Sequence, residues 1–390
     1  MANNNKHTGP NVPALRFPEF SGEWTKIKLR DLGSFFSGGT PSSSRKDYYG
    51  GEIPFIRSGE LHSDSTALSI TKEAYDSCSA KMVNKGDLLL ALYGATSGDI
   101  SISRICGAIN QAILCIRPQY MDAYFIKSLW EKHKKHILET YLQGGQGNLS
   151  SEIIKNISFF FPNSDEQVKI SRLIHIIDDR IETQSKIIEE LTTLRSALLE
   201  KVFQVSNPTL EVGAIAHQTS ERNKLCRYSN VLSVSNRFGF INQSEQFEDR
   251  NVASDDVRNY KVVHRGDFAY NPARINVGSI AMLKSFESGI VSPMYICFQV
   301  DDTIVDPSFF ELFLETKAFK DEVEIRLEGS VRRCLSFEAL CEIHLPRPAL
   351  LVQRSISDKI GNISSKIKLE NRILRAYIRQ KEWLLKQMFI

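Results

Sequence analysis

Residues 149–203, LSSEIIKNISFFFPNSDEQVKISRLIHIIDDRIETQSKIIEELTTLRSALLEKVF, are echoed 186 positions later by residues 335–389, LSFEALCEIHLPRPALLVQRSISDKIGNISSKIKLENRILRAYIRQKEWLLKQMF. When the two stretches are aligned without a gap, 15 of the 55 pairs are identical. A bias toward isoleucine could produce a few of these matches, but it would not also align a proline, a glutamine and the closing phenylalanine. The chain is therefore a tandem of two similar halves.

The repeated stretch has the periodicity of a long helix. Isoleucine and leucine recur at steps of four and three from Ile170 to Val202, which indicates a narrow apolar seam on one side of a helix. Pro162 and the segment 163–165 supply the stop signal and the N-cap in front of it. Each of the two predicted helices has about 39 residues, so at ~1.5 Å per residue each is roughly 55–60 Å long.

A helix of this length cannot be buried alone, so we predict that the two helices pair with each other as a coiled coil. Opposite net charges favour this pairing, because residues 163–207 have a net charge of −2 and residues 349–390 a net charge of +6. Gln184 and Glu370 interrupt the two seams at matching positions, where polar residues tend to fix the register. The alternative is that each helix packs only on its own half of the chain. The expected helix–helix interface consists of Ile170, Ile174, Ile177, Ile181, Ile188, Leu191, Leu198, Ile356, Ile360, Ile363, Ile367, Leu374, Tyr377 and Leu384.

Upstream of each helix the echo continues with small changes of spacing. Lys85-Gly86-Asp87 resembles Arg265-Gly266-Asp267, and we expect a turn before a strand at both places. Short apolar runs with Gly or Asn at their ends alternate with helical patterns, so the fold class is mixed α/β. The expected divisions are an N-terminal arm at 1–23, module one at 24–162, a central helix at 163–207, module two at 208–348 and a C-terminal helix at 349–390.

Composition excludes several classes of protein. Of the 390 residues, 42% are apolar and 24% charged, which is ordinary for a globular protein and unlike a disordered one. No apolar run reaches the ~18 residues of a membrane span, and the N-terminus does not resemble a secretory signal. The seven cysteines form no C-x-x-C pair, which favours reduced thiols in the cytoplasm over a zinc site or a disulfide framework.

Several loops carry groups that suit contacts with nucleic acid. Hydroxyls, open backbone amides, arginines and amides occur in loops at matching places of the two modules, and such groups bond phosphates and base edges. The copies also differ most in these loops. The candidate DNA-binding residues are Thr40, Ser42, Arg45, Lys46, Arg57, Tyr93, Thr96, Gln146 and Asn148 in module one, and Asn236, Arg237, Tyr270, Asn271, Arg274, Arg332 and Arg333 in module two. The alternative for any single loop is an ordinary turn with surface charges.

Catalytic signatures are missing from the sequence. There is no G-x-x-x-x-G-K-[ST] phosphate loop and no H-E-x-x-H, and Asn271-Pro272-Ala273 is not the N-P-P-[FY] of amino-methyltransferases. We therefore predict no catalytic residue and no metal ligand. The alternative from another class is a self-contained nuclease or methyltransferase with an unrecognised site. In that case an acidic pair, Asp178-Asp179 or Asp301-Asp302, would have to hold a metal.

The pattern as a whole resembles the specificity subunit of bacterial type I restriction-modification systems, over nearly the entire chain. No one motif is highly specific, but their order, the two-fold repeat and the missing active site together are. Module two has Gln218-Thr219-Ser220-Glu221-Arg222 where module one has the glycine-rich segment. The segments that carry the resemblance are Leu15-Arg16-Phe17-Pro18-Glu19-Phe20, Gly38-Gly39-Thr40-Pro41-Ser42, Ile53-Pro54-Phe55-Ile56, Lys85-Gly86-Asp87-Leu88-Leu89, Gln167-x-x-Ile170 and the ending from Leu198-Leu199 to Phe203.

The resemblance implies two target-recognition domains separated by two antiparallel helices. Each domain would read one half of a bipartite site on double-stranded DNA, with an unread spacer between the halves. The helices would also dock two modification methyltransferase subunits, which carry S-adenosylmethionine, and restriction-translocase subunits would join them in the full complex. The chain itself would hold no cofactor. Module one has a net charge of +3 and module two of −4, so we expect weak DNA binding by the chain alone.

Overall fold

The computed structural model describes residues 11–141, 148–204, 208–243, 256–329 and 333–390. The chain divides into two compact units. Unit one comprises Met1–Ser185 and Arg372–Ile390, and unit two comprises Lys186–Asn371. Each unit therefore holds one module together with one half of each long helix.

Module one is built on two four-stranded sheets and a short two-stranded one. The first four-stranded sheet is antiparallel throughout, whereas β3 and β8 of the second run parallel. In spatial order, the strands of the first sheet are β2 (Gly33–Ser37), β9 (Ile113–Pro118), β6 (Leu88–Ala91) and β7 (Ile100–Ile102). Those of the second sheet are β4 (Ser69–Ile70), β3 (Tyr49–Ile56), β8 (Gly107–Ile109) and β5 (Lys81–Val83). In the short sheet, β1 (Thr25–Lys28) pairs with β10 (Ser158–Phe161). The helices of this module are α1 (Lys72–Asp76), α2 (Ala123–Tyr141) and α3 (Ser151–Asn156).

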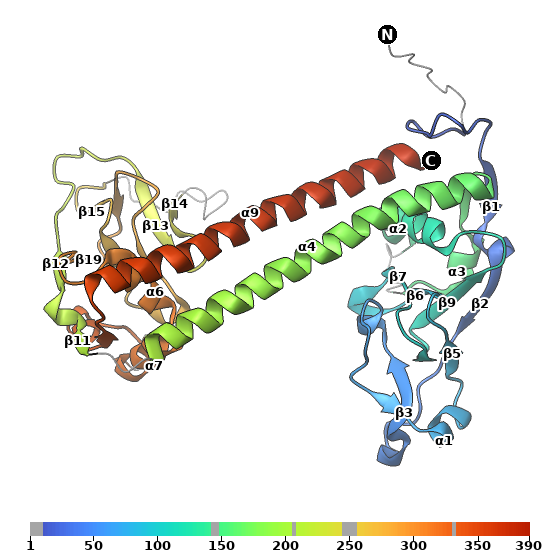
Figure 1. Cartoon of the computed structure of the whole chain (residues 1–390), viewed down its shortest axis with the longest axis horizontal. Coiled ribbons are helices and arrows are strands. Elements are labelled where there is room, and N and C mark those ends of the chain that lie inside the picture. Colours follow the sequence, from blue (N-terminus) through green and yellow to red (C-terminus); the bar gives the residue numbers. More distant parts are fainter. Residues whose placement is uncertain (1–10, 142–147, 205–207, 244–255, 330–332) are drawn as a thin grey trace, which may run out of the picture. The chain divides into compact units, whose positions relative to one another are not determined.

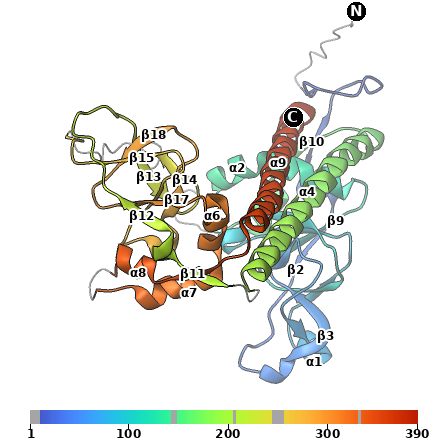
Figure 2. The same cartoon turned by 60° about the vertical axis from the view of Figure 1, so that its left-hand side comes forward.

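Module two repeats the same strand order, including the single parallel pair, β13 with β18. The strands of its first sheet are β12 (Ala216–Thr219), β19 (Ile296–Val300), β16 (Phe268–Tyr270) and β17 (Ile280–Met282). Those of its second sheet are β14 (Gly239–Asn242), β13 (Val231–Ser235), β18 (Ser288–Val291) and β15 (Lys261–His264). In its short sheet, β11 (Thr209–Glu211) pairs with β20 (His344–Pro346). Figure 2 shows α7 (Lys317–Arg326) and α8 (Phe337–Cys341) beside β11, and α6 (Pro307–Glu315) precedes them in the chain. The identical strand order confirms the internal repeat and the mixed α/β class.

The two tripeptides form the same turn. Gly86 and Gly266 have φ values of +96° and +94°, in the left-handed region that favours glycine. Asp87 closes the first turn by accepting a hydrogen bond from the backbone N–H of Asn84 at 2.7 Å, and Asp267 accepts one from His264 at 2.8 Å. Strands β6 and β16 begin immediately afterwards, as expected.

The long helices are α4 (Ser164–Gln204) and α9 (Leu350–Met388), of 41 and 39 residues. In unit one, the first part of α4 shares a core with the last part of α9, through Ile170, Ile174 and Leu384. In unit two, the last part of α4 shares a core with the first part of α9, through Leu199 and Ile360. The helices therefore run antiparallel, and Figure 1 shows the end of α9 beside the beginning of α4.

The apolar seam of α4 shifts along its length. Ile170, Ile174 and Ile177 are buried, whereas Leu198, which we expected in the interface, is 36% exposed. Leu199 takes the buried position at 5% exposure, because a straight α-helix drifts relative to a strict seven-residue repeat. The other expected interface residues of the two helices are buried or half-buried: Ile181, Ile188, Leu191, Ile356, Ile360, Ile363, Ile367, Leu374, Tyr377 and Leu384.

The described part of the N-terminal arm is fastened to unit one. The Arg16 guanidinium forms two hydrogen bonds with the Glu166 carboxylate at the start of α4, and both side chains are almost fully buried. The backbone N–H of Leu15 donates to the carbonyl of Gln387 on α9 at 2.8 Å. The arm thus ties the beginning of α4 to the end of α9.

Candidate nucleic-acid interface

A buried glutamine at the start of α4 joins module one to the helix. The Gln167 side chain donates from Nε2 to the Pro162 carbonyl at 2.9 Å and accepts from the Asp122 backbone N–H at 3.2 Å. Asp122 caps α2 by accepting from the Phe125 N–H at 2.7 Å, and the Ser171 hydroxyl donates to the same carboxylate at 2.6 Å. We call this set of contacts the docking joint.

Module two has the same docking joint on α9. Gln353 donates to the Pro348 carbonyl at 2.8 Å and accepts from the Asp306 N–H at 2.9 Å. Asp306 caps α6, and the Ser357 hydroxyl donates to its carboxylate at 2.9 Å. Repeated glutamine, serine, proline and aspartate residues therefore hold each module on its helix.

Cations at matching positions of the two helices contact the modules as well. In unit one Lys381 of α9 lies 2.7 Å from Glu131 on α2 and 2.8 Å from Asp178 on α4. In unit two Arg195 of α4 forms a bidentate pair with Glu315 on α6 at 2.8 and 2.9 Å and donates to the Ser364 hydroxyl of α9 at 2.7 Å. In both units the cation comes from the long helix that does not carry the docking joint.

The contact in unit one is part of a half-buried ionic cluster. Lys127 lies 2.9 Å from both Asp178 and Glu131, and the Tyr124 hydroxyl donates to Asp178. Burial opposes ionisation of Asp178, but the charges of Lys127 and Lys381 outweigh it and hold the pKa of that carboxyl below its usual value. Burial likewise opposes the charge of Lys381, yet Glu131 and Asp178 raise its pKa.

The acidic pairs that a metal-dependent enzyme would need have other partners. Asp178 is engaged by two lysines, and Asp179 lies 3.6 Å from His175. Asp301 accepts hydrogen bonds from the backbone and hydroxyl of Thr303. Burial raises the pKa values of the Cys115 and Cys297 thiols to about 12. Both thiols are therefore protonated at neutral pH and act as packing groups in the core.

The candidate arginines of module one are already paired with carboxylates. Arg45 contacts Asp47 at 2.5 Å and Glu73 at 3.4 Å, and Arg57 contacts Glu60 at 3.1 Å. The other described candidates lie on loops or short turns at or near the surface. Thr40, Ser42, Lys46, Tyr93 and Asn148 are exposed, and Thr96 is half-buried.

The candidates of module two gather on converging loops. Asn236 and Arg237 are exposed in the turn between β13 and β14. Asn271 and Arg274 lie on the loop after β16, and Asn236 packs against Gly278 at the end of that loop. Arg333 is exposed elsewhere and contacts Glu324 at 3.2 Å.

Tyr270 is a correction to the sequence-based prediction. Its side chain is fully buried, and its hydroxyl donates to the Leu335 carbonyl at 3.3 Å. It belongs to the core that lies under α6, so it stabilises the module and does not present a surface for DNA. Its place directly before the half-buried Asn271 at the start of a loop made it look like a loop residue. Gln146 and Arg332 lie outside the described residues.

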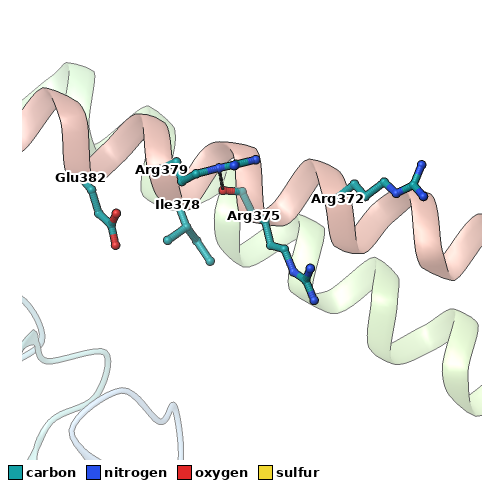
Figure 3. Close-up of a pocket in the computed structure, with 5 residues that line it drawn as sticks. All are labelled: Arg372, Arg375, Ile378, Arg379 and Glu382. Carbon is teal, nitrogen blue, oxygen red and sulfur yellow. Dashed lines mark hydrogen bonds between the residues drawn. The ribbon is translucent and has the colours of Figure 1, made fainter. Parts of the chain in front are cut away.

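The outer side of α9 carries a further group of arginines. Arg372, Arg375, Ile378, Arg379 and Glu382 line a shallow hollow of about 360 Å³ (Figure 3). Arg379 donates from Nε to the Arg375 carbonyl at 3.3 Å. Among the described residues, these three arginines have no carboxylate partner within ion-pair distance. Reasoning from the loops of the modules missed this surface, although the +6 charge of the C-terminal helix pointed to it.

Residues 21–193 match the family model described as the type I restriction modification DNA specificity domain. The chain is 28% identical over 192 residues to the type I restriction enzyme MjaIX specificity subunit of Methanocaldococcus jannaschii, a match that covers 46% of this chain and 44% of that relative. It is 23% identical over 393 residues to the MjaVIII specificity subunit of the same organism, covering 92% of this chain and 89% of the relative. The chain is thus similar to specificity subunits of type I restriction enzymes, and the family model matches its first module and most of α4.

A solved structure has a similar fold. The S subunit of a type I restriction-modification system from M. genitalium superposes with a TM-score of 0.65 at 16% sequence identity, over 97% of this chain and 99% of that one. The match to the MjaIX subunit spans less than half of that relative, whereas the fold match spans both chains almost completely. The similarity in fold thus extends over both modules of this chain. In the described residues, no helix is long and apolar enough to cross a membrane.

Proposed function

We propose that this chain is the non-catalytic DNA-recognition subunit of a type I restriction-modification complex. Each module would read one half of a bipartite site on double-stranded DNA, and the paired helices would set the unread spacer. One observation carries the proposal: the two modules share their strand order and their docking joint, yet their exposed loops differ. A DNA site with two different half-sites requires two recognition modules on one protein, and the modules need different base-contacting residues.

The proposal extends to partners. Two modification methyltransferase subunits would dock on the helices and carry S-adenosylmethionine, and restriction-translocase subunits would complete the cleaving complex. The hollow lined by Arg372, Arg375 and Arg379 offers unpaired cations and the 40%-exposed Ile378 to such a partner. Arginine beside an exposed aliphatic group is a frequent composition of protein interfaces. The seven free thiols and the DNA substrate favour the cytoplasm as its location.

Module-specific substitutions test the proposal. In the assembled complex, R274A should relax the methylated motif at one position of the half-site read by module two, with a loss of about 1–3 kcal/mol there. The other half-site should stay unchanged, because module one is untouched. The measurement is methylome sequencing of cells that carry the system with the wild-type or the variant chain. A motif that changes in both halves, or in neither, contradicts separate reading by two modules.

A second experiment separates the proposal from the rival enzyme. The purified chain is incubated with DNA, Mg²⁺ and S-adenosylmethionine, with and without the methyltransferase subunits. We expect methylation only when those subunits are present. Cutting or methylation by the chain alone would show that it carries its own active site.

A further inference from the structure

Three loops meet at one end of module two. Asn236, in the turn after β13, packs on Gly278, and the Ser279 hydroxyl donates to the Val234 carbonyl at 2.8 Å. The Tyr295 hydroxyl accepts from the Val234 N–H at 3.4 Å, which brings the loop after β18 to the same place. We call this end the module-two tip, which consists of Asn236, Arg237, Phe238, Asn271, Arg274, Val277 and Met294.

The module-two tip exposes three large apolar side chains. Phe238 is 71% exposed, Val277 56% and Met294 57%, and each lies on a different one of the three loops. A single exposed apolar residue on a surface is ordinary. Three on loops that meet at one end form an apolar patch on that end, and such patches often mark binding surfaces.

The charges beside the patch identify the class of partner. In the part of the chain that the structure describes, neither Arg237 nor Arg274 has an ion pair, whereas Arg45 and Arg57 of module one are held by carboxylates. The Arg237 guanidinium lies 5.7 Å from the centroid of the Phe238 ring, so a cation lies beside one of the apolar side chains. Unpaired arginines and amides around apolar groups suit a DNA groove, where the C5-methyl of thymine is the apolar group on the base edges of the major groove.

We propose that Phe238, Val277 and Met294 contact the methyl group of a thymine in the half-site that module two reads. This inference rests on the proposed function and adds to it a chemical feature of the recognised base. The arginines and amides at the tip bond phosphates or base edges, and the apolar patch selects the pair that carries the methyl group.

Uracil substitution tests the contact directly, because uracil pairs like thymine and lacks only the methyl group. The half-site is first determined from the methylome. The assembled complex is then titrated with duplexes in which each thymine of that half-site is replaced singly by deoxyuridine. We expect one position at which the dissociation constant rises about fourfold, which corresponds to one buried methyl group. A half-site without any A·T pair, or no position that responds, overturns the inference.

The variant F238A/V277A/M294A links that response to the tip. It should bind the thymine and the uracil duplexes with equal affinity, because the surface that meets the methyl group is gone. The matched control is L225A, which removes a 72%-exposed leucine of module two outside the tip and should keep the fourfold ratio. Because the three residues are more than half exposed, the variant should unfold at the wild-type temperature. A triple variant that retains the ratio overturns the inference.

The two proposals fail in different ways. If the proposed function is wrong, the assembled complex shows no preference for any sequence over a scrambled duplex. If only the methyl contact is wrong, sequence preference remains while uracil substitution and the triple variant leave it unchanged.

Discussion

Gln167 and Gln353 show what the repeated residues of this chain do. Each is almost fully buried and bonds both a proline carbonyl and the N–H of a helix-capping aspartate. A buried amide must satisfy its donors and acceptor, and glutamine is long enough to reach both partners from one helix position. The identities at proline, glutamine and serine therefore mark the places where each module is attached to its helix.

Two glycines should respond to alanine in opposite directions. Gly86 has a φ of +96° and an empty surrounding, so G86A should lower the free energy of unfolding by about 1–2 kcal/mol through backbone strain alone. Gly361 lies inside α9 with no atom near its Cβ position, so G361A should raise the free energy of unfolding by about 1 kcal/mol. Urea unfolding of both variants measures the changes. Equal signs would contradict the assigned conformations.

Sequence patterns predicted some residue roles and missed others for physical reasons. The turn at Gly86 was predictable because glycine tolerates the positive φ of a turn and an apolar run of strand length follows it. The docking joint was visible only as unexplained identities, because hydrogen bonds between Asp122 and Gln167 join positions 45 residues apart. Tyr270 was misplaced because burial depends on α6 and Leu335, which are distant in sequence.

The pairing of α4 with α9 uses ionic groups as well as the apolar seam. Lys381 and Arg195 occupy seam positions that correspond in the repeat, and both reach carboxylates on module helices. The length of the apolar seam and its steps of three and four residues predicted two paired helices, and the structure confirms this pairing. These contacts could not be predicted, since Glu131 and Glu315 lie on α2 and α6 of the modules, although Asp178 lies on the facing helix.

Acidification should weaken the attachment of α9 in unit one. The pKa of Asp178 is held below its usual value of about 3.9, so its ionised form stabilises the folded state above about pH 4. This contribution is lost as the pH falls through the lowered pKa. D178N should therefore lower the free energy of unfolding by about 2 kcal/mol at pH 7, and the difference from wild type should shrink below pH 4.

Asp179 supplies the matched control for this prediction. It is the next residue on α4, its side chain is 62% exposed, and its partner is His175 at 3.6 Å. D179N should change the free energy of unfolding little at either pH. Urea titrations of wild type, D178N and D179N at several pH values make the comparison. Equal losses from both variants would mean that the cluster does not hold α9.

Both long helices continue from one unit into the other, and each unit pairs the beginning of one with the end of the other. Periodicity and internal repetition were enough to predict this plan, because a 3.6-residue pattern over ten turns has no competing structure. The strand order within the modules was beyond prediction, since short apolar runs do not reveal their pairing partners. The strand order is seen only in the structure, where both modules have the same order.

Lengthening both helices should lengthen the recognised site. One heptad inserted after Ser185 in α4 and one after Asn371 in α9 keep the seams in step and add about 10 Å, or about three base pairs. The methylome should show the same two half-sites with a spacer about three base pairs longer. A heptad in α4 alone should abolish methylation, because the two seams no longer match. An unchanged spacer in the double insertion would mean that the helices do not set it.

The docking joint has a consequence for how such a molecule can change. Because the same four side-chain and backbone groups fasten either module, everything between two joints can be exchanged as a cassette while the fastening remains intact. Under the proposed function, new recognition sequences would then arise when related genes exchange whole modules, while the two long helices stay unchanged.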